Sequence, residues 1–267
     1  MTTDAPTRIA KPAAASVCER ILIGVDGGKG ALDACRQATR LAGPGATVEA
    51  AFVSLYPPAT ARALGVEAVA ERIERTSSVA LAAAGRILGP HAALRRLQGF
   101  TVEALLDEVR RLQVTLLALG PPEHARIEEI VLGGVGGELL HKAPCSILVA
   151  RPVPNEASFP RSIVAGIDGS ESADRAYEVA DQLATRFHSE LAGVVADGGK
   201  HVDLALIRRR HPGVELAAGS PVSALVEAAS CADLLVVGNR GRHGLRALGS
   251  VSERIAHEAA CSVLVVR

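Results

Sequence analysis

The sequence has very few aromatic residues. Tryptophan is absent, and phenylalanine and tyrosine together make up 2% of the 267 residues. Because 48% of the residues are apolar, the core must be built from aliphatic side chains, and the chain is globular rather than disordered. An excess of one charge is missing too, since Lys and Arg total 29 and Asp and Glu total 29. The overall charge therefore does not favour binding to nucleic acid or to a membrane surface, and any basic site must be local.

Long apolar runs and a disulfide framework are also absent. No run approaches the roughly 18 to 20 apolar residues that span a bilayer. The stretch 1–17 is rich in Ala, Thr and Pro and lacks the apolar centre of a signal peptide. The five cysteines are an odd number without the Cys/His spacing of a zinc site, and we interpret them as buried thiols in a reducing compartment. We therefore expect a cytoplasmic protein that binds neither membranes nor nucleic acid.

Three segments occur twice, in the same order, which indicates an internal duplication. The matching pairs are 21–28 with 163–170, 114–120 with 232–238, and 143–151 with 259–267. The second copy is 24 residues shorter between its first two segments, where the first copy has a long helical pattern at 60–88. The organisation that we predict is a disordered tail at 1–19, a domain at 20–151, a Pro-rich linker at 152–160 and a domain at 161–267.

Each copy alternates short β-branched runs with Ala/Leu-rich helical patterns, which is typical of βαβ units around a parallel sheet. In the first copy we predict strands at 20–25, 47–55, 92–97, 114–119 and 146–150, and helices at 29–42, 60–88, 101–112 and 134–142. In the second copy we predict strands at 162–167, 190–196, 213–217, 233–237 and 262–266, and helices at 171–187, 201–210, 221–231 and 250–259.

The stretch 238–252 carries the strongest functional signal. It follows an apolar strand, contains four glycines and three arginines without an acid, and leads into a predicted helix. Glycines allow backbone N–H groups to approach an anion closely, and a helix N-terminus adds unpaired N–H groups and a positive dipole end. These features predict a phosphate site; the alternative is a basic surface loop. Asp168 and Gly238 end neighbouring strands, so both belong on the rim of the sheet where ligands bind.

These residues resemble the universal stress proteins in their tandem form. The resemblance covers residues 20 to 267 and rests on the Ile167-Asp-Gly-Ser170 turn, the glycine loop from Gly238 to Ser250, and the last strand, Ala260-Cys-Ser-Val-Leu-Val-Val266. It implies an α/β fold of two tandem, doubly wound, five-stranded parallel sheets with strand order 3-2-1-4-5, like the adenine-nucleotide α-hydrolases. It also implies that the last strands of the copies pair, giving a pseudo-two-fold monomer; the alternative is a homodimer.

The resemblance implies a bound adenine nucleotide, ATP with Mg²⁺. Asp168 would hold a ribose hydroxyl, and the backbone of Val195 would face the adenine. The loop would hold the phosphates, although seven residues separate Gly241 from Gly249 where the family usually has nine at this place. The complete set of implied binding residues is Asp168, Gly169, Ser170, Val195, Gly238, Asn239, Arg240, Gly241, Gly249, Ser250, Val251 and Ser252.

The first copy keeps Asp26 but loses most of this loop. Gly120-Pro-Pro-Glu123 stands in place of Gly-x-x-Gly, and Gly133-Gly134 in place of Gly-Ser. Residues 120–134 carry a charge of −2, whereas residues 238–250 carry +3. A triphosphate is thus repelled by one loop and attracted by the other, which predicts one competent site, in the C-terminal half, and a degenerate N-terminal half.

Several functions fit this reading. The first is a regulator that binds ATP and an unknown protein partner; the others are a nucleotide-independent interaction protein or scaffold, and a weak ATPase. The sequence does not choose among ATP, a cyclic nucleotide and another adenine compound. No nucleophile with a base, and no metal-ligand cluster, is evident. His141 and His257 are expected at helix ends, Cys145 and Cys261 as buried thiols, and Arg208–His211 as a solvated face.

Overall fold

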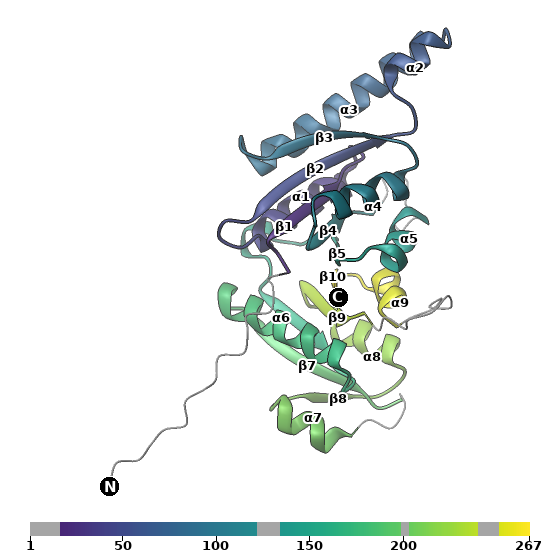
Figure 1. Cartoon of the computed structure of the whole chain (residues 1–267). Coiled ribbons are helices and arrows are strands. Elements are labelled where there is room, and N and C mark those ends of the chain that lie inside the picture. Colours follow the sequence, from purple (N-terminus) through teal and green to yellow (C-terminus); the bar gives the residue numbers. More distant parts are fainter. Residues whose placement is uncertain (1–16, 122–133, 199–202, 240–250) are drawn as a thin grey trace.

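The computed structural model describes residues 17–121, 134–198, 203–239 and 251–267. Within them, two halves of similar architecture join edge to edge into one ten-stranded sheet with helices on both faces (Figure 1). The strand order is β3-β2-β1-β4-β5-β10-β9-β6-β7-β8. Each half therefore has the order 3-2-1-4-5, which confirms the predicted fold class.

The N-terminal half contains five parallel strands in the predicted places. Its elements are β1 (Arg20–Gly24), α1 (Lys29–Leu41), β2 (Thr47–Ser54), α2 (Pro58–Ala63), α3 (Glu67–Leu88), β3 (Ala93–Gln98), α4 (Thr101–Arg111), β4 (Leu116–Leu119), α5 (Gly134–Lys142) and β5 (Ser146–Val149). The single helix predicted at 60–88 is wrong, because Gly65 has a φ of 73° and separates α2 from α3. A left-handed residue of this kind ends a helix, and glycine adopts it without steric cost.

The C-terminal half repeats the pattern with shorter connections. After a 3-10 turn at Glu156–Ser158, its elements are β6 (Ser162–Gly166), α6 (Glu171–Phe187), β7 (Glu190–Ala196), α7 (Leu204–Arg210), β8 (Glu215–Ala217), α8 (Pro221–Ala228), β9 (Leu234–Gly238), α9 (Val251–Glu258) and β10 (Ser262–Val266). In place of α2 and the long α3 it has only α7, which accounts for the length difference between the two copies.

The two halves meet at an antiparallel pair of strands. β5 pairs with β10, with Leu148 opposite Leu264, whereas all other neighbouring strands run parallel. The predicted pairing of the last strands within one chain is thus confirmed. All residues of both strands are buried, as expected for the centre of a sheet that is covered on both faces.

The core is aliphatic and extends across both halves. One buried cluster lies on each face of the sheet: the first includes Leu105 and Leu225, and the second includes Ala34 and Ala180. Four cysteines are buried, as predicted, but Cys231 is exposed, because the turn after α8 leaves it at the surface. Within the described residues, no helix is both long enough and apolar enough to cross a bilayer.

Two arginines tie the halves together across the seam. Arg151 follows β5 and donates from Nη2 to the carbonyl oxygen of Ala256 in α9, at 2.9 Å. Arg267 follows β10 and donates in the same way to the carbonyl oxygen of Leu140 in α5. Each half therefore supplies a cation to the last turn of a helix in the other half, where the dipole favours positive charge. Burial lowers the pKa of both guanidinium groups.

Candidate functional site

The turn after β6 is organised by its own side chains. Oδ1 of Asp168 accepts a hydrogen bond from the Ser170 N–H at 3.0 Å, and Gly169 has a φ of 79°. Oγ of Ser170 then accepts from the Ala173 N–H at 3.3 Å, so that Ser170 is the N-cap of α6. This arrangement is an Asx turn leading into a capped helix. It holds the half-buried Asp168 at the carboxyl end of the sheet.

Gly238 lies against the same helix start. A Cβ atom added to Gly238 would lie 2.4 Å from the carbonyl oxygen of Ser172, which is far inside van der Waals contact. Gly120 in the other half has the same constraint, since its Cβ would lie 2.0 Å from the carbonyl carbon of Gly30. Close packing of strand end on helix start therefore requires both glycines. The sequence analysis assigned Gly238 to phosphate binding and missed this second requirement.

Asn239 forms hydrogen bonds within the protein through its backbone and its side chain. Its backbone N–H donates to the carbonyl oxygen of Val266 at 2.8 Å. With its amide oriented so that the oxygen faces Arg267, that oxygen accepts from Nη1 and Nη2 of the guanidinium at 2.9 Å. Asn239 thus orients the arginine that reaches across the seam to α5. Its side-chain oxygen points toward the seam and not into the rim of the sheet.

The remaining predicted residues are only partly placed. Val195 lies in β7, and its side chain packs with Ile167, Ile207 and Val214. Val251 and Ser252 open α9, the first exposed and the second buried. Arg240, Gly241, Gly249 and Ser250 lie outside the described residues. The structure thus brings together Asp168, Gly169, Ser170 and Gly238 at the junction of β6, β9 and α6.

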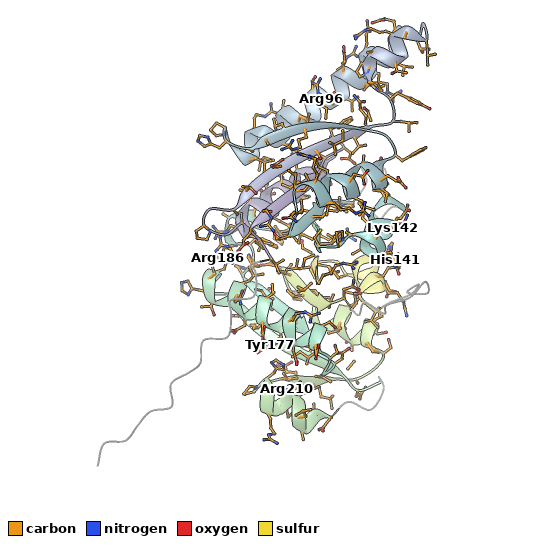
Figure 2. All side chains as sticks on the ribbon, viewed as in Figure 1. Arg96, His141, Lys142, Tyr177, Arg186 and Arg210 are labelled. Carbon is orange, nitrogen blue, oxygen red and sulfur yellow. The ribbon has the colours of Figure 1, made fainter. Side chains whose placement is uncertain are left out.

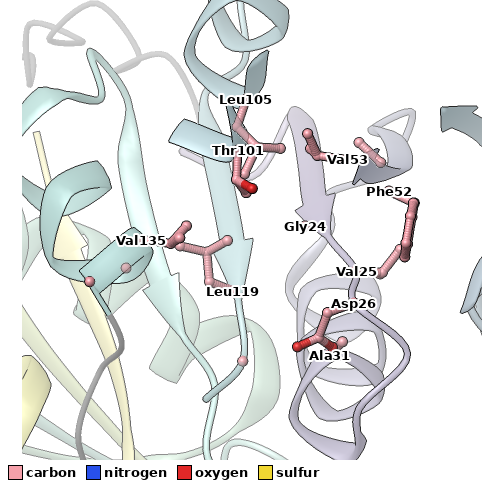
Figure 3. A pocket seen from close by; sticks show the side chains of 14 residues that line it. Gly24, Val25, Asp26, Ala31, Phe52, Val53, Thr101, Leu105, Leu119 and Val135 are labelled. Carbon is pink, nitrogen blue, oxygen red and sulfur yellow. The ribbon is translucent and has the colours of Figure 1, made fainter. Parts of the chain in front are cut away.

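The N-terminal half contains a cavity at the equivalent rim. Its volume is about 460 Å³, and it lies between the ends of β1 and β2 on one side and β4, α4 and α5 on the other (Figure 3). Asp26, the counterpart of Asp168, lines it, and Oδ1 of Asp26 accepts from the Gly28 N–H at 2.8 Å. Sequence reasoning treated this half as degenerate and did not predict an open cavity there.

His141 links the two halves. Its Nε2 lies 2.9 Å from Oε1 of Glu253, so α5 contacts α9 across the seam. Figure 2 labels His141 where the two helices meet. The equivalent histidine, His257, lies beside Gly137, which stands at the position equivalent to Glu253 and has no side chain. His141 lies in the last turn of α5, as expected, and it also contacts the carboxylate of the other half.

The basic run 208–211 is only partly a solvated face. Arg208 and Arg209 are exposed, but His211 is buried, with Nε2 3.0 Å from Oδ1 of Asp174. The His211 ring also packs on Tyr177, with 4.3 Å between ring centroids, close to Arg210 (Figure 2). His211 therefore fixes the end of α7 to α6. Among the described residues, no three His, Cys, Asp or Glu side chains are grouped as metal ligands.

Comparisons with known proteins agree with this architecture. The model of the Universal stress protein family matches residues 18–151 and 202–267. The chain belongs to the universal stress protein family. It is 29% identical over 186 residues to one universal stress protein of Mycobacterium tuberculosis, covering 58% of this chain and 62% of that protein. It is 28% identical over 228 residues to a second one, covering 73% of this chain and 71% of the relative.

A solved structure of the family has the same fold over nearly the whole chain. The crystal structure of a universal stress protein from Archaeoglobus fulgidus aligns with a TM-score of 0.69 and 18% identity, covering 94% of this chain and 96% of that one. At this identity the likeness concerns the fold. The match to the first mycobacterial relative spans less than two thirds of that relative's length.

Proposed function

We propose that the protein is an ATP-binding regulator of the stress response, with one competent nucleotide site in its C-terminal half. The observation that carries the proposal is the meeting of Asp168, Ser170 and Gly238 at one rim of the sheet. A loop with three arginines and no acid connects this rim to the start of α9. The proposal treats residues 20–151 and 161–267 as the two domains, with 1–19 as a tail and 152–160 as a linker.

The residues present fit a nucleotide. The half-buried carboxylate of Asp168 retains acceptor capacity for a ribose hydroxyl, because a carboxylate has about four lone-pair sites. The positive end of the helix dipole at the start of the eight-residue α9 favours a phosphate, together with the arginines at 240, 242 and 246. In this proposal Asn239 contributes indirectly, by fixing the end of β9 through Arg267.

A magnesium ion would reach the site with the phosphates. The described residues offer no group of three metal-ligating side chains. Mg²⁺ commonly keeps several waters and binds through substrate phosphates and one or two carboxylates. We therefore expect metal binding to depend on the nucleotide. In the regulatory role, nucleotide occupancy would shift the population of loop conformations and so change binding of a protein partner.

Calorimetric titration of the full-length chain with ATP and Mg²⁺ tests the proposal. We expect one site per chain, with affinity reduced at least 100-fold by Gly241→Glu, which introduces the acid that the first copy has at Glu123. Asp168→Asn should weaken binding, whereas the matched Asp26→Asn should not. Two ATP sites, or an affinity unaffected by Gly241→Glu, would contradict the assignment. Absence of any binding would favour the nucleotide-independent interaction protein.

A further inference from the structure

The buried arginine that follows β5 at the seam is only partly hydrogen-bonded. Arg151 is 2% exposed, and its Nη2 donates to the carbonyl oxygen of Ala256. The two other nitrogens of the guanidinium, Nε and Nη1, are buried and have no hydrogen-bond partner among the described residues. Buried polar groups are nearly always hydrogen-bonded, to protein, to water or to an ion. These two nitrogens therefore require an acceptor that the described part of the chain does not supply.

The polar side chains next to the Arg151 backbone are engaged with one another. Nε2 of Gln37 donates to the carbonyl oxygen of Arg151 at 2.6 Å, and the Arg151 N–H donates to Oγ of Ser262 at 2.9 Å. Oγ of Ser262 in turn donates to Oε1 of Gln37 at 2.7 Å. This buried network fixes the backbone that carries the arginine. It also uses the acceptor atoms of both side chains, so neither turns toward the guanidinium.

The other half shows where the acceptor of such an arginine lies. Arg267 is the counterpart of Arg151, and its Nη2 donates to the carbonyl oxygen of Leu140, the counterpart of Ala256. Its Nη1 lies 2.9 Å and its Nε 3.3 Å from the side-chain oxygen of Asn239. The two nitrogens without a partner on Arg151 are thus the same two that the asparagine oxygen faces on Arg267.

A proline replaces this asparagine in the N-terminal half. Pro121 stands at the position of Asn239, and its side chain has no hydrogen-bond acceptor. The ring is packed against α1, since a Cβ atom at Gly30 would lie 2.6 Å from Cδ and 2.9 Å from Cγ of Pro121. The proline side chain is therefore directed toward α1 and does not take the place of the asparagine amide beside the arginine.

The charge of Arg151 is not balanced within the described residues. The titratable group that acts on its guanidinium there is the thiol of Cys261, which directly precedes β10. Burial raises the pKa of this thiol to about 11, so it is uncharged at neutral pH. Burial of an ion without a counter-charge is costly. A water molecule would complete the hydrogen bonds but leave the charge unbalanced, whereas a small anion would do both.

We propose that Arg151 binds a small monovalent anion of the halide class through Nε and Nη1, in the place that the side-chain oxygen of Asn239 takes beside Arg267. This site is separate from the cavity beside Asp26, since neither Arg151 nor Pro121 lines that cavity, and it does not depend on nucleotide binding. Because Arg151 also donates to α9 of the other half, the anion would stabilise a contact that joins the two halves.

Thermal unfolding of the full-length chain in sodium chloride, compared with sodium gluconate at the same ionic strength, tests the proposal. We expect chloride to raise the unfolding midpoint in a saturable way, by about 3 °C at ten times its Kd, and the bulky gluconate not to do so. Arg151→Met should abolish this chloride response, whereas the matched Arg267→Met should retain it. A chloride response that persists in Arg151→Met would overturn the proposal, as would equal midpoints in the two salts, which would mean that water satisfies the arginine.

A second variant keeps the arginine and supplies the acceptor. Pro121→Asn places an amide where the other half has Asn239, so the chloride response should disappear although Arg151 remains. Crystals grown in sodium bromide provide a direct view, because the anomalous signal of bromide should lie beside Nε and Nη1 of Arg151 and be absent in Pro121→Asn. An unchanged chloride response in Pro121→Asn, or bromide bound only at exposed arginines, would contradict the assignment.

Discussion

The two halves of this chain share one backbone plan but differ at the rim where a ligand would bind. Both have a glycine at the end of the fourth strand, pressed against the first turn of a helix, and both send an arginine across the seam. Beyond those points the C-terminal rim continues into a basic loop, and the N-terminal rim continues into prolines and acids. The shared features are those required by packing, and the differences lie in the sequences of the two loops that follow.

The two rims also differ in what the sequence places after the fourth strand. The N-terminal rim encloses a cavity with Asp26 in the wall, and the stretch that follows Gly120 carries prolines and acids where 238–250 carries glycines and arginines. Apolar walls of this extent favour burial of a ring-sized group.

The largest expected effect is on the glycines that both halves share. Gly120→Ala and Gly238→Ala each place a Cβ within 2.4 Å of helix backbone, which cannot move without displacing α1 or α6. We expect each variant to lower the free energy of unfolding by about 3 kcal/mol or more, at the upper end of overpacking effects. Urea-induced unfolding measures it. The control is Gly134→Ala, where nothing lies within 4 Å.

The outcome separates the packing role of Gly238 from a role in binding. If Gly238→Ala folded normally and lost only ATP binding, the glycine would serve the ligand and the packing interpretation would be wrong. If both variants were destabilised and Gly134→Ala were not, the shared glycines would be structural. The functional difference between the halves would then begin with the residues that follow these glycines, Pro121 and Asn239.

Substitution of the two seam arginines should change the free energy of unfolding by less than the glycine substitutions do. Nε and Nη1 of the buried Arg151 have no hydrogen-bond partner among the described residues, whereas Arg267 is paired with Asn239. Removing a buried guanidinium that is poorly paired is often neutral or stabilising, but removing a well-paired one leaves its partner unsatisfied. We expect Arg151→Met to change the free energy of unfolding by less than about 1 kcal/mol, and Arg267→Met to lower it by about 2 kcal/mol.

Chemical denaturation of the two methionine variants provides the measurement. Because Pro121 stands where the N-terminal half would need an equivalent of Asn239, the Asn239→Ala variant offers a control: it should remove most of the difference between the two arginines. Equal losses of unfolding free energy for Arg151→Met and Arg267→Met would mean that the hydrogen bonds between Arg267 and Asn239 contribute nothing measurable to stability.

The equivalent buried thiols of the two halves should contribute to stability with the same pH dependence. Burial raises the pKa of Cys145 and Cys261 from 9.0 to about 11. The unfolded thiols ionise above pH 9 while the folded ones stay protonated. The stability that they contribute is therefore complete below pH 9 and declines as the pH rises toward 11, by about 1 kcal/mol per thiol per pH unit. Unfolding curves of Cys145→Ala and Cys261→Ala between pH 8 and 10.5 measure this loss.

Alkylation offers an independent check on the thiols. At pH 8 the folded chain should react rapidly at Cys231, which is exposed, and all five cysteines should react after unfolding. Rapid modification of Cys145 or Cys261 in the folded chain would contradict their burial.

Most of the fold could be predicted from the sequence, because its signals are local or repeated. Helix α6 was predicted at its observed bounds; Ser170 caps its start, and His188, which has a positive φ, follows its end. The pairing of β5 with β10 was implied by the family resemblance, in which the last strands of two domains pair. The break at Gly65 was missed, because glycine within an Ala-rich pattern is compatible with either a continuous or an interrupted helix.

The candidate site was predictable only in part. The place of Asp168 at the rim was expected from its position at the end of a strand, but the Asx turn and the helix cap beside it were not predicted. The partner of Asn239 was not predicted either, because Arg267 is 28 positions away in the sequence and no local pattern links them. The cavity around Asp26 was missed for the same reason: its walls come from six elements, and a volume between elements leaves no signature in the sequence.

The smallest expected effect concerns the one-sided histidine bridge. His141 meets Glu253 at 2.9 Å, but the pseudo-two-fold places Gly137 opposite His257. A double-mutant cycle with His141→Ala and Glu253→Gln should give a coupling of about 0.5 to 1 kcal/mol, as for other partly exposed pairs. The pair joins α5 to α9, and each of these helices begins at the rim of its own half. A coupling near zero would therefore mean that this contact does not link the two rims.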